Sequence, residues 1–154
     1  MLDCESRTDV SQELTLGFYR LLKLEGTVYV LEEEGAFFND DLPKRERKVL
    51  EAYVQNAIPD HPPSLPPRFP LHSRAEFVRT VLYRYARKGA LIVGFNICYD
   101  LARLATKWTA GDENEWSLVL SEYPDGNENL NHPRILIEPL DSKKAFIRFR
   151  AEWV

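Results

Sequence analysis

The first third of the chain alternates apolar and polar residues, as half-buried strands do. Residues 1–5 read MLDCE, and residues 13–23 read ELTLGFYRLLK, with apolar side chains at alternate positions over part of each segment. The β-branched and aromatic run TVYVL at residues 27–31 follows a turn at Gly26, and its strand should end near Phe38. The pattern predicts an antiparallel hairpin, with the first five residues as a third strand.

Helical spacing replaces this alternation in the next part of the chain. Residues 43–57 carry apolar side chains three and four positions apart, and an Asn-Asp-Asp triplet before them can cap a helix. Residues 59–70 hold six of the ten prolines, which predicts a surface loop. A second helix should begin after Ser73, with Glu76 completing a capping box, and end at Gly89.

The apolar run ALIVGF at residues 90–95 is continuous rather than alternating. Such a run is typical of a strand that is buried on both faces. Helical spacing returns over residues 98–108, and β-branched and aromatic residues then become frequent. We expect three further strands, at residues 116–123, 134–140 and 145–150.

Taken together, the elements predict one α/β domain over residues 1–154. Its mixed sheet should hold three antiparallel strands followed by a parallel strand, with flanking helices and a C-terminal antiparallel β extension at residues 116–150. The composition agrees, because 44% hydrophobic and 29% charged residues is an ordinary balance for a globular domain.

Charge and termini narrow the class of protein. The net charge of -4 argues against a protein that coats nucleic acid non-specifically, but not against an enzyme that grips one strand end through metal ions. No apolar run approaches the roughly 20 residues of a membrane span, and the N-terminus does not resemble a signal peptide. Cys4 and Cys98 fit a reducing compartment better than a disulfide framework. We therefore expect a soluble, cytoplasmic protein without a membrane partner.

Candidate chemistry begins with two acids near the N-terminus. Asp3 and Glu5 are one residue apart, so on a strand both carboxylates lie on the same face, about 7 Å apart at their backbones. They repel each other unless a positive charge lies between them, and oxygen ligands of this kind suit Mg²⁺ or Mn²⁺. Asp100 follows the predicted buried strand, so the three carboxylates converge if the two strands are neighbours.

Two short motifs carry a family resemblance. Residues 3–5, DCE, resemble the D-x-E motif of the DEDD 3′–5′ exonucleases, and residues 96–100, NICYD, resemble their second motif, N-x-x-(F/Y)-D. The order of the predicted elements also resembles the ribonuclease-H-like fold of that family: three antiparallel strands, a helical connection, a buried strand and an aspartate-bearing helix. The resemblance covers the first two motifs only.

The resemblance implies an activity and a set of site residues. Two metal ions, Mg²⁺ or Mn²⁺, would be held by Asp3, Glu5 and Asp100, and phosphodiester bonds would be hydrolysed at single-strand ends of DNA or RNA. Asn96 would orient the site or the substrate strand through its amide, and we assign Tyr99 to substrate binding with it.

The third motif of the family, Y-x-x-x-D or H-x-x-x-x-D, is not found after residue 100. Tyr123 is followed four residues later by Asn127, and His132 five residues later by Ile137. We therefore expect an exonuclease domain that is incomplete at its C-terminus, with a further domain or partner chain beyond residue 154. The alternative is a catalytically incomplete ribonuclease-H-like module that binds nucleic acid or protein, and the missing motif favours this alternative for the chain as given.

Simpler interpretations of the same residues stay open. Asp3 and Glu5 are also what a solvated strand end would carry, and Asp100 suits the first turn of a helix for electrostatic reasons. Asn96 is a good helix cap in its own right. The basic and aromatic residues between positions 68 and 88 fit either a phosphate-binding surface or the wet face of a helix. The tryptophans, Trp108, Trp116 and Trp153, fit a core or an interface.

Overall fold

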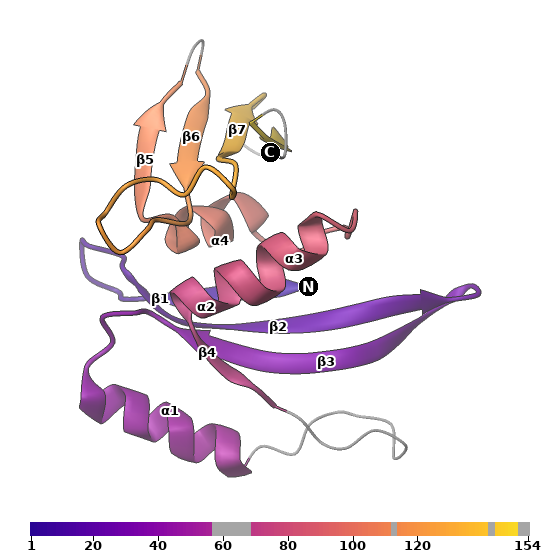
Figure 1. Cartoon of the computed structure of the whole chain (residues 1–154), viewed down its shortest axis with the longest axis vertical. Coiled ribbons are helices and arrows are strands. Elements are labelled where there is room, and N and C mark those ends of the chain that lie inside the picture. The colour runs from indigo at the N-terminus through magenta and orange to yellow at the C-terminus, as the bar shows by residue number, and fades with distance from the viewer. Residues whose placement is uncertain (57–68, 112–113, 142–143, 151–154) are drawn as a thin grey trace.

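Two four-stranded sheets, with helices around and between them, form the chain in the computed structural model (Figure 1). The structure describes residues 1–56, 69–111, 114–141 and 144–150. In the N-terminal sheet the strand order is β1-β2-β3-β4; β1, β2 and β3 are antiparallel, and β4 runs parallel to β3. Its strands are β1 (Leu2–Ser6), β2 (Leu14–Glu25), β3 (Val28–Phe38) and β4 (Leu71–Ser73).

The predicted arrangement of three antiparallel strands followed by a parallel one is confirmed, but the parallel strand is a different segment. The prediction of a buried strand at residues 90–95 is wrong, because this segment forms no strand, Leu91 is 81% exposed and Phe95 is fully exposed. The segment follows the outer edge of β1, where the backbone N–H of Leu2 donates to the Val93 carbonyl oxygen at 2.8 Å. A continuous apolar run indicates extended backbone, but burial also requires a neighbouring element on each side.

One face of the N-terminal sheet is covered by a helix in three sections (Figure 1). The Ser73 hydroxyl accepts a hydrogen bond from the Glu76 backbone N–H at 3.2 Å, so the predicted N-cap is confirmed. Phe77 stacks on Phe37 of β3, with ring centroids 4.1 Å apart. Gly89, at φ +78°, follows the end of the helix as predicted. The sections are α2 (Arg74–Phe77), the π-helical η1 (Val78–Leu82) and α3 (Tyr83–Ala86).

The opposite face of the sheet carries α1 (Lys44–Asn56), which confirms the helix predicted at residues 43–57. Phe18 of β2 meets Tyr53 of α1 edge to face, with ring centroids 6.3 Å apart. Leu50 is the buried residue of this helix. The proline-rich loop that was predicted at residues 59–70 lies mostly outside the described residues.

The second sheet is an antiparallel meander that follows α4 (Ile97–Leu104). The three strands predicted in the last third of the chain are confirmed, but the helix predicted at residues 98–108 is wrong at its C-terminal end. The chain leaves the helix after Leu104, and Trp108 lies in a strand that the sequence did not predict. The reason is tertiary, because this segment pairs with a later strand. The strands are β5 (Lys107–Ala110), β6 (Trp116–Val119), β7 (Ile135–Pro139) and β8 (Ala145–Phe149).

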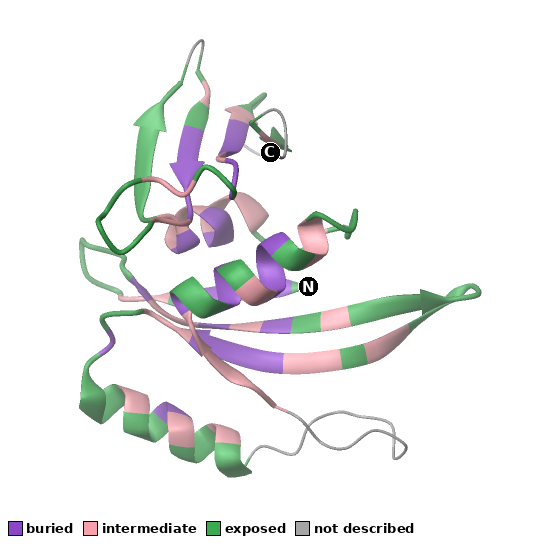
Figure 2. Ribbon diagram, in the orientation of Figure 1, coloured by how far each residue is buried: buried purple, intermediate pink, exposed green. Residues whose placement is uncertain are grey.

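A continuous cluster of buried side chains joins the two sheets through the helices. Arg74, at the start of α2, is buried inside this junction. Its guanidinium donates to the carbonyl oxygens of Leu104 and Leu120, each at 3.0 Å, and pairs with the Asp40 carboxylate at 2.8 Å. The far ends of β2 and β3 extend beyond the core and are largely exposed (Figure 2). None of the described helices is long and apolar enough to span a membrane.

Candidate functional site

Two of the three predicted acids, Asp3 and Glu5, lie on β1, at the outer edge of the N-terminal sheet. Leu2 and Cys4 are buried while Asp3 and Glu5 are exposed, so the two acids lie on the same face of the strand. No hydrogen bond or ion pair joins either carboxylate to another described residue. Both acids therefore face solvent without a positively charged neighbour bound to them.

Asp100 reaches the same edge from the first turn of α4. The residue is only 2% exposed, and its Oδ1 accepts a hydrogen bond from the Cys4 backbone N–H at 3.1 Å. Because Cys4 lies between Asp3 and Glu5, the Asp100 carboxylate contacts the strand between the two acids. Leu2, two residues before Cys4, donates its N–H from the same edge to Val93. The Asp100 side chain thus takes the place of the next backbone acceptor along this edge.

Gly94 makes room for this arrangement. A Cβ atom at this position would lie 3.0 Å from Asp100 Oδ2 and 3.0 Å from the Leu2 carbonyl oxygen. A side chain here would push the segment away from β1 or displace the carboxylate. In the sequence, Gly94 lies within the apolar run at residues 90–95. A glycine inside a strand-like pattern is the signal that a close backbone approach leaves in a sequence.

The Asp100 carboxyl is buried and only one of its two oxygens is hydrogen-bonded to a described residue. Its Oδ2 is buried and has no hydrogen-bond partner among the described residues. Burial raises the pKa of the Asp100 carboxyl, the hydrogen bond from Cys4 opposes this, and the charges of Asp3 and Glu5 raise it further. In the described part of the chain no lysine or arginine forms an ion pair with any of the three carboxylates.

Asn96 and Tyr99, assigned to substrate binding, lie at the start of α4 within four residues of Asp100. Asn96 occupies the N-cap position, but its side chain makes no capping hydrogen bond, so the amide is not used by the helix. The Tyr99 hydroxyl is hydrogen-bonded to the Ser6 hydroxyl at the end of β1. The Arg103 guanidinium lies over the Tyr99 ring, 5.0 Å from its centroid.

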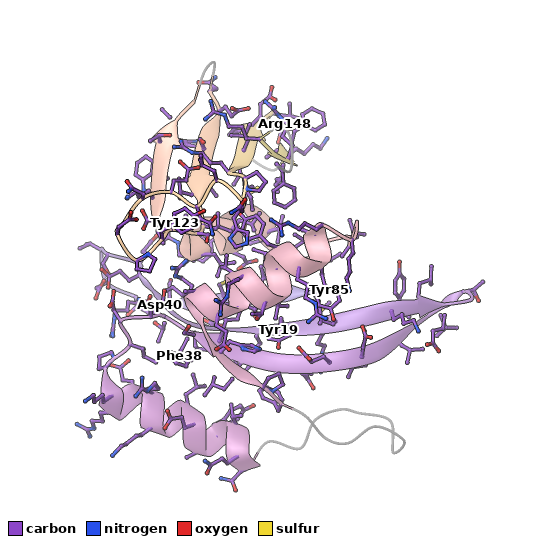
Figure 3. The ribbon with its side chains drawn as sticks, in the orientation of Figure 1. Tyr19, Phe38, Asp40, Tyr85, Tyr123 and Arg148 are labelled. Carbon is purple, nitrogen blue, oxygen red and sulfur yellow. The ribbon has the colours of Figure 1, made fainter. Side chains whose placement is uncertain are left out.

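These two residues line a cleft of about 1150 Å³ between α4 and the second sheet, and the three carboxylates do not. Trp108 of β5 and Trp116 of β6 also line this cleft. Asp40, which Figure 3 labels near the start of α2, lies at the cleft with its partner Arg74. From the sequence alone the tryptophans fitted a core or an interface, and this cleft was not predicted.

Tyr123 and His132, whose spacing did not fit the third motif, have partners elsewhere in the structure. Tyr123, labelled in Figure 3, is exposed, and its hydroxyl accepts a hydrogen bond from the Asn131 side chain. His132 is buried and stacks on Tyr83, with ring centroids 4.4 Å apart, and its Nδ1 lies 2.8 Å from the Ser121 hydroxyl. None of these contacts joins them to the three carboxylates. Both residues serve the connection between β6 and β7.

Among the described residues, no group of three or more histidine, cysteine, aspartate or glutamate side chains forms a ready-made metal site. Asp100 contacts β1 between the other two acids, but closing all three carboxylates around one ion requires Asp3 and Glu5 to turn toward it. Cys4 and Cys98 are free thiols, and burial raises the pKa of each above its ordinary value. They act as small apolar side chains beside the acids.

The fold and this site define a mixed α/β protein in which a buried aspartate contacts the edge strand between two exposed acids. No family model, no curated protein and no solved structure matches the chain.

Proposed function

We propose that the chain is a metal-dependent 3′–5′ exonuclease domain, or part of one, that hydrolyses phosphodiester bonds at single-strand ends of DNA or RNA. The observation that carries the proposal is the buried carboxylate of Asp100. It is held by the Cys4 N–H between Asp3 and Glu5, and its second oxygen has no partner among the described residues. A buried unpaired oxygen beside two further negative charges is costly, and a divalent cation relieves both costs at once.

The donor set fits Mg²⁺ or Mn²⁺, because carboxylate oxygens are the ligands that these ions prefer. Asp100 is fixed by its hydrogen bond, whereas Asp3 and Glu5 are exposed and can change rotamer to close the site. Two ions bound by the three carboxylates would supply an activated water and stabilise the leaving 3′ oxygen. Asn96 would orient the substrate strand through its unused amide, and the Tyr99 hydroxyl would keep α4 aligned with the end of β1.

Thermal melting with Mn²⁺ tests the metal site directly. At a Mn²⁺ concentration about 100 times Kd, binding to the folded state adds about 2.7 kcal/mol, or roughly 5–10 °C in Tm for a chain of this size. Asp100→Asn keeps the shape of the side chain and the acceptor for Cys4, and it should remove the shift. Glu32→Gln, an exposed acid on β3, is the matched control and should melt with the parent shift.

Activity is measured on a 5′-labelled single-stranded oligonucleotide, where an exonuclease of this polarity shortens the labelled strand one nucleotide at a time. We expect Mn²⁺ to support this ladder and Asp100→Asn to abolish it. A parent protein that shows neither a melting shift nor shortening would instead be the catalytically incomplete module for binding nucleic acid or protein. The observation that favours this incomplete module is that the described residues contain no preformed metal cluster.

A further inference from the structure

The cleft between α4 and the second sheet has an aromatic wall. Trp108 pairs with Leu118 across β5 and β6, and Trp116 pairs with Ala110, so both tryptophans lie on the same face of the sheet. Their rings meet at 67°, with centroids 5.2 Å apart. Trp108 is 64% exposed and Trp116 is 44% exposed, while Leu118 beside them is buried. The inner part of this sheet face joins the core, and its outer part is an open aromatic surface.

The part of the lining that α4 and its N-cap supply includes three polar side chains. Asn96 presents an amide that the helix does not use, and Arg103 lies over Tyr99. The Tyr99 hydroxyl is bonded to Ser6, the last residue of the strand that carries Asp3 and Glu5. The cleft therefore begins beside the acidic strand, and its lining combines aromatic faces with hydrogen-bonding groups.

The charges that line this cleft are mixed, unlike those of a basic groove that attracts phosphates. The described residues lining it include five carboxylates and three basic side chains, and one of each is used in the Arg74–Asp40 pair. A lining of this kind does not attract phosphates strongly. A ligand is held here mainly by contact with the tryptophans, and flat aromatic groups make the best such contact.

We propose that this cleft binds single-stranded nucleic acid by stacking its bases on Trp108 and Trp116, with Asn96 and Arg103 contacting the strand from the α4 part of the lining. The choice of nucleic acid over peptide rests on the proposed function. The volume of about 1150 Å³ exceeds the roughly 300–1,000 Å³ of a typical small-molecule site, which suits a stretch of polymer. Stacking is tolerant of sequence, because every base has an aromatic face.

The binding test uses a 5′-fluorescein-labelled thymidine decamer in EDTA, followed by fluorescence anisotropy. Trp108→Ala and Trp116→Ala should each weaken binding by about 5- to 100-fold, and Trp108→Phe should recover part of the loss by keeping a ring. Phe146→Ala is the matched control, because Phe146 is 61% exposed on β8 and points to the opposite face of the same sheet. Melting curves establish that each variant is folded.

Salt dependence separates stacking from phosphate neutralisation. Between 50 and 200 mM salt we expect Kd to change less than about tenfold, whereas six to ten phosphate contacts would change it by roughly 10³–10⁵. A parent-like Kd for folded Trp108→Ala, or an equal loss in Phe146→Ala, would overturn the proposal. So would quenching of tryptophan fluorescence by a lysine-rich dodecapeptide but not by the decamer, which would assign the cleft to a protein partner.

The two proposals fail separately. A parent protein that gains Tm with Mn²⁺ but does not bind the decamer loses the cleft assignment and keeps the metal site. A parent that binds the decamer through Trp108 but shows no Mn²⁺ shift keeps the cleft assignment and loses the exonuclease.

Discussion

The two surfaces that meet at α4 depart from ordinary protein surfaces in opposite ways. On the side of β1, the Asp100 carboxylate is buried although one of its oxygens has no partner among the described residues. On the side of the second sheet, Trp108 and Trp116 are exposed although burial would stabilise them. Buried polar groups are usually bonded and large aromatic groups usually covered. Each departure costs stability, and a ligand bound as proposed at each surface would offset that cost.

The largest expected effect on stability comes from removing the side chain of Arg74, which is buried at the junction of the two sheets. Arg74→Ala removes the ion pair to the Asp40 carboxylate and leaves two carbonyl oxygens, of Leu104 and Leu120, without the Arg74 donor. We expect the free energy of unfolding to fall by about 3–5 kcal/mol, measured by urea denaturation. Arg84→Ala, an exposed arginine of α3, is the control and should change it by less than about 0.5 kcal/mol. An equal loss in the two variants would show that Arg74 is not a structural tie.

The second-largest expected effect is on the contact between Asp100 and β1. Gly94→Ala brings a Cβ within 3.0 Å of Asp100 Oδ2 and of the Leu2 carbonyl oxygen. We expect a loss of about 1–3 kcal/mol from overpacking and a weaker Mn²⁺ melting shift, with little effect on decamer binding in EDTA. Val93→Ala alters the exposed neighbour in the same segment and should keep the shift. If Gly94→Ala also melts with the full Mn²⁺ shift, the carboxylate is not held as tightly as described.

The smallest expected effect concerns His132, a buried titratable group in the connection between β6 and β7. Burial lowers the pKa of His132 below 6.5, and the charges of Arg87 and Arg79 lower it further. Below pH 6.5 the unfolded chain therefore takes up a proton that the folded protein resists. Stability should fall with falling pH in that range, by at most about 1.4 kcal/mol per pH unit.

Melting curves of the parent and of His132→Gln, recorded side by side from pH 7.5 to 5, measure how much His132 contributes to the pH dependence of stability. The difference between the two curves should narrow as the pH falls, because the variant lacks the titrating ring. Asp100, whose pKa is raised, contributes in the opposite direction, but it is present in both proteins and cancels. A constant difference across the range would mean that the His132 ring titrates alike in the folded and unfolded states.

Much of the fold followed from local pattern. The alternation in residues 13–23 predicted β2, and Ser73 with Glu76 predicted the start of α2, because each signal depends on groups only a few residues apart. The strand β4 was missed because its three residues pair with β3 without a pattern of their own. Residues 90–95 were misjudged because their sequence records apolar character and not which elements cover it.

For the candidate site too, part was predictable from local sequence and part depended on tertiary packing. The sequence by itself determined that Asp3 and Glu5 share a face, because side chains alternate along any strand. Only the tertiary structure decided that Asp100 contacts the Cys4 N–H between them, and that Trp108 and Trp116 line a cleft instead of a core. The physical reason is range: alternation is set by the backbone of neighbouring residues. Burial and convergence depend on segments roughly 100 residues apart, which meet only after the whole chain has packed.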